Sequence, residues 1–257
     1  MPGLLEGLVK MKKMIALAAF CAVCQSATAA TTARMELPEE FTASATHIEF
    51  SGFGGHNKGT YSFADNRGSH YRGDFKRGES RLGVFDPLLV RNKGKGSFSF
   101  RDPGSDAELT AACEFKKYTV NVDVVTFDAK KVAYSCDFRG NSALLGARLI
   151  IGQPKRQGMK QKFLARDLRS GESALFDQYL TLESVHDYRG TKLSSQQPVG
   201  YLIRSADRIV AAVELTDWNP GIYLSPDLSD DMQRSVLVTA LAIAVFRDPA
   251  HSALEDD

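Results

Sequence analysis

The 257-residue sequence lacks any recognisable catalytic motif and any excess of charge of one sign. No Gly-x-Ser-x-Gly element is present to position a nucleophilic serine, and no His-x-x-x-His pair is present to hold a metal ion. Basic and acidic residues number 32 and 31, a balance that argues against a dedicated nucleic-acid binder. The sequence therefore predicts no cofactor, no metal site and no nucleic-acid partner, and it favours a protein that is not an enzyme.

Long apolar runs are also scarce, and the first of them indicates a destination outside the cytoplasm. Two lysines precede an apolar stretch at residues 14–24, and small residues follow at positions 27–29. This order is typical of a bacterial secretory signal, and the stretch is shorter than the roughly 20 residues that span a bilayer. We expect residues 1–29 to be an upstream extension and signal peptide, whether translation starts at Met1 or at Met11. The mature chain is then periplasmic or secreted.

Cysteine is rare as well, because only Cys113 and Cys136 lie beyond the predicted signal. In an oxidising compartment, a pair of this kind is expected to form a disulfide. Both cysteines fall on the apolar face of a segment in which apolar and polar residues alternate, so the two sulfurs can meet there. Closing this loop would stabilise the fold by about 3–4 kcal/mol in the chain-entropy model. The alternative is a pair of buried free thiols.

Alternation of apolar and polar residues is what the sequence has in abundance. From about residue 45 to residue 224, short alternating segments are separated by turns rich in Gly, Asp, Asn and Pro. We expect about twelve strands, one of them over residues 174–185. The β-branched run at 122–127 changes phase and predicts a bulge, while the lysines and glycines of residues 91–96 predict a flexible turn. This spacing of strands is typical of a barrel or a sandwich.

The last predicted element is a helix of about residues 229–247. Serine and aspartate residues that favour a helix start occupy positions 225–231, and residues 235–246 are apolar on every side. These residues would extend about 18 Å, too short for a hydrocarbon core of roughly 30 Å, so no transmembrane helix is expected in the mature chain. A helix that is apolar all round must be buried, and strands can bury it only by closing around it. The sequence thus predicts a mainly β fold, a closed antiparallel barrel around a buried C-terminal α-helix.

This layout resembles the tubby C-terminal superfold, which the LURP-one-related and phospholipid-scramblase families share. The resemblance covers about residues 40–248 and contains no diagnostic motif. It implies that basic residues beside the barrel hold anionic lipid headgroups. The alternative is an unrelated secreted β-sandwich whose last helix packs on one face. The predicted linker, barrel domain and flexible acidic tail cover residues 30–44, 45–248 and 249–257.

One short stretch concentrates positive charge. Six cations occur within fifteen residues, with one acid among them: Lys155, Arg156, Lys160, Lys162, Arg166 and Arg169. Lys160 and Lys162 share a strand face and can converge on a phosphate. In a secreted bacterial protein, this cluster predicts a binding or scaffold module that contacts an anionic lipid or another envelope polyanion. The alternative is a solvated hairpin whose lysines prevent pairing at a strand edge.

A hydrolase is the alternative from another functional class, and its site would assemble from residues that are dispersed in the sequence. The acid–base candidates are His47, His56, His70, His186 and Asp187. Of these, His186 and Asp187 fall at a predicted strand end, where a solvated loop is the simpler interpretation. Trp218 lies in a predicted turn before the helix, where we expect it to plug the end of the barrel.

Overall fold

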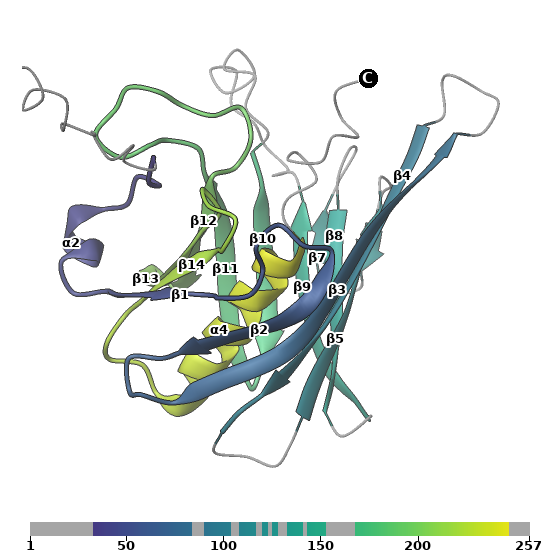
Figure 1. Ribbon diagram of the computed structural model, residues 1–257, viewed down its shortest axis with the longest axis horizontal. Helices are drawn as coiled ribbons and strands as arrows, with labels where there is room; N and C mark the ends of the chain where they lie inside the picture. Colours follow the sequence, from purple (N-terminus) through teal and green to yellow (C-terminus); the bar gives the residue numbers. More distant parts are fainter. Residues whose placement is uncertain are drawn as a thin grey trace, which may run out of the picture. The chain divides into compact units, whose positions relative to one another are not determined.

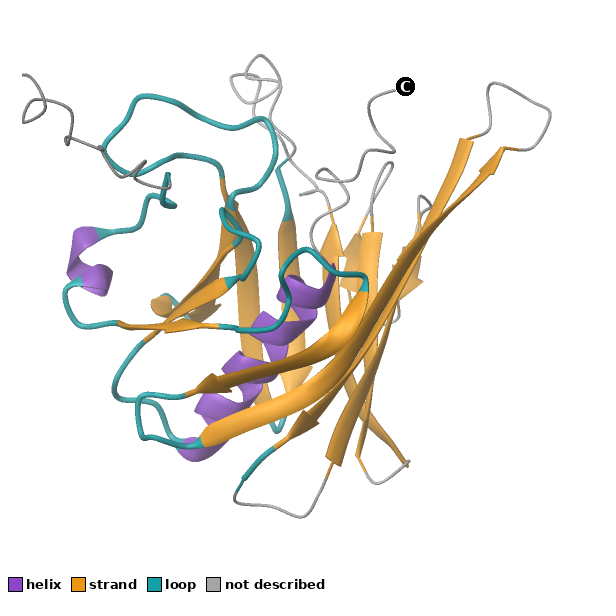
Figure 2. Ribbon diagram, in the orientation of Figure 1, coloured by secondary structure: helices purple, strands orange, loops and turns teal. Residues whose placement is uncertain are grey.

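The computed structural model describes residues 33–83, 90–103, 108–116, 120–122, 125–127, 133–140, 143–152 and 168–246. In this part of the chain, twelve strands form one antiparallel sheet that curls into a nearly closed barrel (Figures 1 and 2). A helix of seventeen residues, α4 (Asp230–Phe246), packs against the sheet. The expected mainly β barrel around a C-terminal helix is confirmed, and α4 begins and ends within one residue of the predicted bounds.

From its second strand to its last, the sheet is a meander, because each of these strands pairs with the next strand of the sheet along the chain. In chain order the strands are β1 (Thr46–Glu49), β2 (Lys58–Ala64), β3 (His70–Gly83), β4 (Val90–Arg101), β5 (Glu108–Lys116), β8 (Ala133–Gly140), β9 (Ala143–Gly152), β10 (Ser170–Leu175), β11 (Gln178–Val185), β12 (Gly200–Ser205), β13 (Arg208–Glu214) and β14 (Gly221–Leu224). β1 returns to pair with β14 and so brings the first strand next to the last.

A separate two-stranded ladder, β6 (Val120–Val122) and β7 (Val125–Phe127), lies between β5 and β8 in the chain. Val122 is opposite Val125 in this ladder. The bulge predicted for residues 122–127 is therefore wrong. The change of phase in the sequence reflects two strands that pair with each other, not one strand with an inserted residue.

The barrel closes between β1 and β2, which form the two edges of the sheet. Ser51 and Ser62 exchange backbone hydrogen bonds of 3.0 and 3.1 Å across this seam. The glycine-rich connection between the strands lies close above it, because a Cβ at Gly52 would be only 2.2 Å from the Thr60 carbonyl oxygen. Gly52 also has a φ of 96°, so both the space and the backbone at this position require glycine.

The interior is filled by α4 and by the inward side chains of the strands. Every helix residue from Ser235 to Val245 is at most 2% exposed, which is the enclosure that its uniformly apolar sequence predicts. Two polar contacts tie the helix to the inner face of the sheet. The Ser173 hydroxyl lies 2.9 Å from that of Thr239, and the Tyr134 hydroxyl donates to the Ala242 carbonyl at 2.7 Å.

Gly94 and Gly96, which were predicted to belong to a flexible turn, lie inside β4. A Cβ at Gly96 would meet Val245 of the helix at 3.4 Å and the Cβ of Cys113 at 3.8 Å. These are ordinary contact distances, and they show that β4 packs against α4 at this position. The turn prediction is wrong because both glycines pair within the sheet, Gly94 with Phe115 and Gly96 with Cys113 of β5.

The predicted single strand over residues 174–185 is in fact a hairpin, β10–β11. Its turn consists of Phe176 and Asp177, both in the left-handed region, with φ values of 51° and 56°. A two-residue turn with two positive φ angles matches the right-handed twist of the strands that it connects. The residues preferred in such a turn are Asn and Gly. Phe176 compensates by packing against the core and under the Arg234 guanidinium, 5.4 Å from the ring centre.

Replacing Asp177 by glycine should stabilise the protein. The side chain is exposed, and glycine adopts a φ of 56° without the steric cost that an L-residue incurs. We expect D177G to raise the free energy of unfolding by about 0.5–1 kcal/mol, measured by denaturant titration. The control is Asp207→Gly in the β12–β13 turn, where the residue is not left-handed and glycine should destabilise. Equal effects of the two substitutions would contradict this interpretation.

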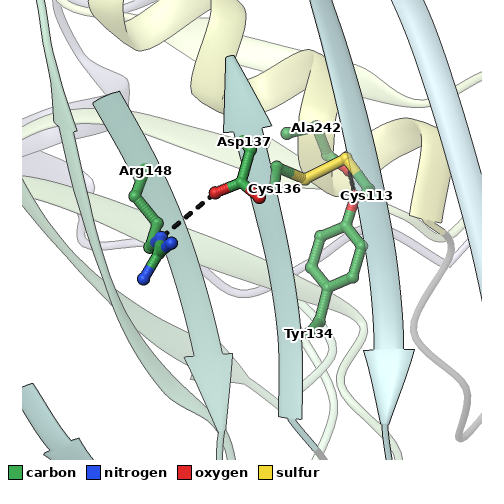
Figure 3. Close-up of a disulfide and its surroundings, with 6 residues drawn as sticks. All are labelled: Cys113, Tyr134, Cys136, Asp137, Arg148 and Ala242. Atoms are coloured by element: carbon green, nitrogen blue, oxygen red, sulfur yellow. Dashed lines mark hydrogen bonds and ion pairs between the residues drawn. A yellow bond between two sulfur atoms is a disulfide. The ribbon is translucent and has the colours of Figure 1, made fainter. Parts of the chain in front are cut away.

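The predicted disulfide is present between Cys113 of β5 and Cys136 of β8 (Figure 3). The two residues are directly opposite in the strand register, with Cα atoms 4.0 Å apart, and both are buried. Figure 3 places Tyr134 and its acceptor Ala242 beside the sulfurs. The cross-link therefore joins two strands at the point where β8 is also bound to α4.

Residues 34–42, which lie within the range predicted to be a linker, pack on the outside of the barrel. We call this segment the N-terminal strap; it includes the short helix α2 (Glu39–Thr42). Its buried side chains are Met35, Leu37 and Phe41. They form a second apolar cluster with outward-facing residues of the sheet, among them Ala212 of β13. Both faces of β13 are thus covered.

Candidate functional site

The two ends of the barrel differ in their connections. One end, here called the turn end, carries tight hairpin turns and the start of α4. The other, the loop end, carries the longer connections, including residues 50–57, 186–199 and 215–220. β9 ends and β10 begins at the loop end. The sequence between these strands contains five of the six cations of the predicted cluster, Lys155, Arg156, Lys160, Lys162 and Arg166, which lie outside the described residues.

Arg169, the sixth cation, lies just before β10 and is only 3% exposed. Its backbone N–H donates to the Ser184 hydroxyl at 2.9 Å. The Ser184 N–H in turn donates to the Arg169 carbonyl at 3.0 Å. The predicted cluster thus ends on a cation that is buried in the rim of the barrel, not on the solvent-exposed surface.

His186 lies beside Arg169, so the structure brings together residues that the sequence assigned to two different hypotheses. Its Nε2 atom is 2.9 Å from the Ser184 hydroxyl and its Nδ1 atom is 3.2 Å from the Ser195 carbonyl. Because a carbonyl only accepts hydrogen bonds, we assign the ring proton to Nδ1. Nε2 then accepts the Ser184 hydroxyl proton. Asp187 is exposed and hydrogen-bonds to Ser194.

The other three histidines lie on separate elements. His47 is on the outer face of β1, where its ring is 4.6 Å from that of Tyr223. Partial burial, together with the nearby Arg34 guanidinium, lowers the pKa of His47. His56 belongs to the connection between β1 and β2, and His70 starts β3. Within the described ranges, no group of three or more His, Cys, Asp or Glu side chains is placed to hold a metal ion.

Trp218 does not plug the barrel. It is 62% exposed, and it lies over the glycine-rich connection, since a Cβ at Gly55 would be 2.6 Å from its ring. The neighbouring Asn219 accepts a hydrogen bond of 2.9 Å from the Gly54 N–H. The expectation of a plug is wrong because the core is completed by α4. The tryptophan instead joins two connections on the rim.

Sequence reasoning missed Glu214, a carboxylate that is buried beneath the N-terminal strap. It is 2% exposed and accepts hydrogen bonds from the Met35 N–H at 2.7 Å and from the Arg34 guanidinium at 3.0 Å. The Tyr223 hydroxyl is 3.3 Å away. An acid at the end of the apolar segment 209–215 was the available signal. These partners anchor the strap to the outer face of the sheet.

Asp65 is a second missed carboxylate, and it holds the turn end together. It is 7% exposed and accepts four hydrogen bonds. Two come from the backbone of its own turn, one from the Tyr71 hydroxyl at 3.1 Å and one from the Gln233 amide at 2.7 Å. Arg67 of the same turn pairs with Asp230. The β2–β3 turn is thereby bound to the first turn of α4.

Stability should fall in alkaline solution because buried tyrosines resist ionisation in the folded state. Burial, assisted by the Asp65 carboxylate, raises the pKa of Tyr71 to about 12, and burial also raises the pKa values of Tyr61 and Tyr134. In the unfolded chain these phenols ionise near pH 10. The contribution of these tyrosines to stability is therefore complete below about pH 10 and is lost as the pH rises above it. Denaturant titrations across this range test the expectation, and Tyr71→Phe should reduce the slope.

A groove of about 770 Å³ lies on the outside of the barrel, over the seam and the adjoining strands. Its walls come from the five strands β1 to β5 and from residues that directly follow β1 and β4. Charged residues of both signs line it, among them Glu49, Arg72 and Arg101. No sequence pattern indicated this groove, because its members are brought together only by the register of the strands.

Comparison with known proteins finds no matching family model, no similar curated protein and no similar solved structure. The resemblance to the tubby superfold therefore stays a prediction. None of the helices in the described part of the chain is long and apolar enough to cross a bilayer.

Proposed function

We propose that this protein is a secreted or periplasmic, non-enzymatic binding or scaffold module that acts through the loop end of its barrel. The filled interior is the observation that carries the proposal. Because α4 occupies the barrel, with residues 235–245 almost fully buried, the surfaces that remain for a ligand are the rim and the outside. The buried disulfide supports the extracytoplasmic part of the proposal, since such bonds persist in oxidising compartments.

The proposed ligand is an anionic lipid surface or another envelope polyanion. Five cations of the predicted cluster belong to the β9–β10 connection, and the sixth, Arg169, lies in the rim. Several cations on one short connection attract a polyanion more strongly than a chain with balanced charge does as a whole. This attraction acts over about a Debye length, so it should weaken as salt is added.

Co-sedimentation with vesicles tests the proposal. The protein should sediment with vesicles that contain anionic lipid, should not sediment with purely zwitterionic vesicles, and should be released by salt. A variant with glutamine at Lys155, Arg156, Lys160, Lys162 and Arg166 should lose this binding. A control variant with the same change of charge carries glutamine at Lys58, Lys76, Lys95, Arg139 and Arg208, which are exposed elsewhere. Equal loss in both variants, or binding to zwitterionic vesicles, would overturn the proposal.

A hydrolase is the second candidate, favoured by the hydrogen bond between Ser184 and His186. A serine hydroxyl that donates to a neutral imidazole, itself oriented through its other nitrogen, is the arrangement that activates serine nucleophiles. A fluorophosphonate probe tests this candidate on the intact protein. Covalent labelling of Ser184, lost in the His186→Gln variant, would favour the hydrolase. Absence of labelling would leave the hydrogen bond as a structural contact of the rim.

A further inference from the structure

The strand register aligns five side chains across the outer groove. In order across the sheet the paired residues are Ser51, Ser62, Arg72, Arg101 and Glu108. Residues directly opposite each other on antiparallel strands point to the same face, and neighbouring strands lie about 5 Å apart. All five residues line the groove. We call this set the cross-strand row.

The centre of the row carries two guanidinium groups side by side. Like charges directly opposite each other on neighbouring strands destabilise a sheet. Arg101 is neutralised by Glu108, which lies 3.1 Å away. Arg72 is exposed and makes no ion pair or side-chain hydrogen bond to any other residue in the described ranges. The Arg72 guanidinium is therefore available to a ligand, and its charge does not stabilise the fold through any ion pair in the described ranges.

The acidic residues of the groove limit the charge of a ligand. Glu49 lines the groove and Glu108 compensates Arg101, so the groove has no net positive charge with which to hold a multiply charged anion. Asp102 is already paired with Arg234 at 2.6 Å. The Ser51 and Ser62 hydroxyls are both exposed, and neither hydrogen-bonds to another described side chain. Next to Arg72, the groove therefore offers hydroxyl groups and not further cations.

We infer that this groove binds a small monocarboxylate rich in hydroxyl groups, the chemistry of a sugar acid. The Arg72 guanidinium holds the carboxylate through two parallel N–H donors, a geometry that a planar guanidinium provides and an ammonium does not. Ser51 and Ser62 exchange hydrogen bonds with the hydroxyls of the ligand, and His70 lines the groove beside them. A volume of about 770 Å³ is sufficient for a ligand of this size. The site contains no residue of the β9–β10 connection, and the inference does not depend on the proposed function.

Chemical-shift titration of the ¹⁵N-labelled protein tests this inference with three probes: glucuronate, glucose and inorganic phosphate. Glucuronate should shift the amide signals of Ser62, Arg72 and Arg101 in a saturable manner. Glucose lacks the carboxylate and should bind at least tenfold more weakly, since it cannot form the charge-assisted hydrogen bonds to Arg72. Phosphate should also bind more weakly, because the groove has no net positive charge to hold a dianion.

Two variants locate the binding. Arg72→Gln should weaken glucuronate binding by about tenfold or more, while keeping the unfolding midpoint of the parent protein. Arg208→Gln, which removes an exposed arginine on the opposite part of the sheet, should leave the affinity unchanged. The inference is overturned if glucuronate shifts no groove signals, if phosphate or glucose binds as well as glucuronate, or if the two variants behave alike.

Discussion

Reduced protein is expected to be less stable than oxidised protein by about 3 kcal/mol. The Cys113–Cys136 bond closes a loop with a sequence separation of 23, and this constraint removes conformations from the unfolded chain. Both cysteines are at most 2% exposed, so a thiol reagent has no access to the bond while the barrel is folded. Reduction should therefore require unfolding first.

The experiment compares three forms of the protein by denaturant titration. Oxidised protein is compared with protein reduced in denaturant and refolded in reductant, which keeps both sulfur atoms and loses only the bond. The double variant Cys113→Ala, Cys136→Ala should be less stable again, because it also leaves a cavity. In native oxidised protein prepared without residues 1–29, which contain Cys21 and Cys24, a thiol-reactive dye should detect no sulfhydryl. Equal stability of the oxidised and reduced forms would contradict the expectation.

Replacement of Asp65 by alanine should cost a similar amount, about 3 kcal/mol or more. The substitution removes the acceptor of four hydrogen bonds and leaves the Tyr71 hydroxyl and the Gln233 amide buried without a partner. Each buried polar group that loses its partner costs about 1–3 kcal/mol. The turn end would also lose the contact between the β2–β3 turn and α4.

The Asp65→Asn variant tests whether the negative charge of Asp65 is required or only its size and hydrogen bonds. The Oε1 atom of Gln233 has no hydrogen-bond partner among the described residues, so a rotated Gln233 amide can accept from the new asparagine. We therefore expect asparagine to be tolerated with a loss of about 1 kcal/mol. Denaturant titration of the three proteins measures both effects. A loss in D65N as large as in D65A would show that the negative charge itself is required.

The elements that could be predicted from the sequence are those whose pattern of apolar and polar residues reflects directly which of their faces are buried. The all-apolar run before Phe246 requires burial on every side, and this requirement led to the closed barrel. The alternating segments around Cys113 and Cys136 placed both sulfurs on the inner face. In both cases, the side chains of one element show directly what surrounds them.

What could not be predicted depends on contacts between distant parts of the chain. Phe176 and Asp177 carry no Asn or Gly signal, and the turn is stabilised by Arg234 of the helix. Glu214 is buried only because the N-terminal strap covers it. The cross-strand row arises from pairing that no single strand reveals. The cations of the β9–β10 connection, by contrast, are visible in the sequence, but a pattern of charges does not say which of them face solvent.

The position of α4 after all the strands has a consequence for how the protein reaches its folded state. The sheet can begin to form hairpin by hairpin, but its inner face has no partner until residues 230–246 are available. Until then, an apolar surface and two open strand edges are exposed, a condition that favours aggregation. A nascent chain is thus vulnerable for almost the whole of its length. Productive folding should therefore be a late, nearly all-or-none event that benefits from a holding chaperone.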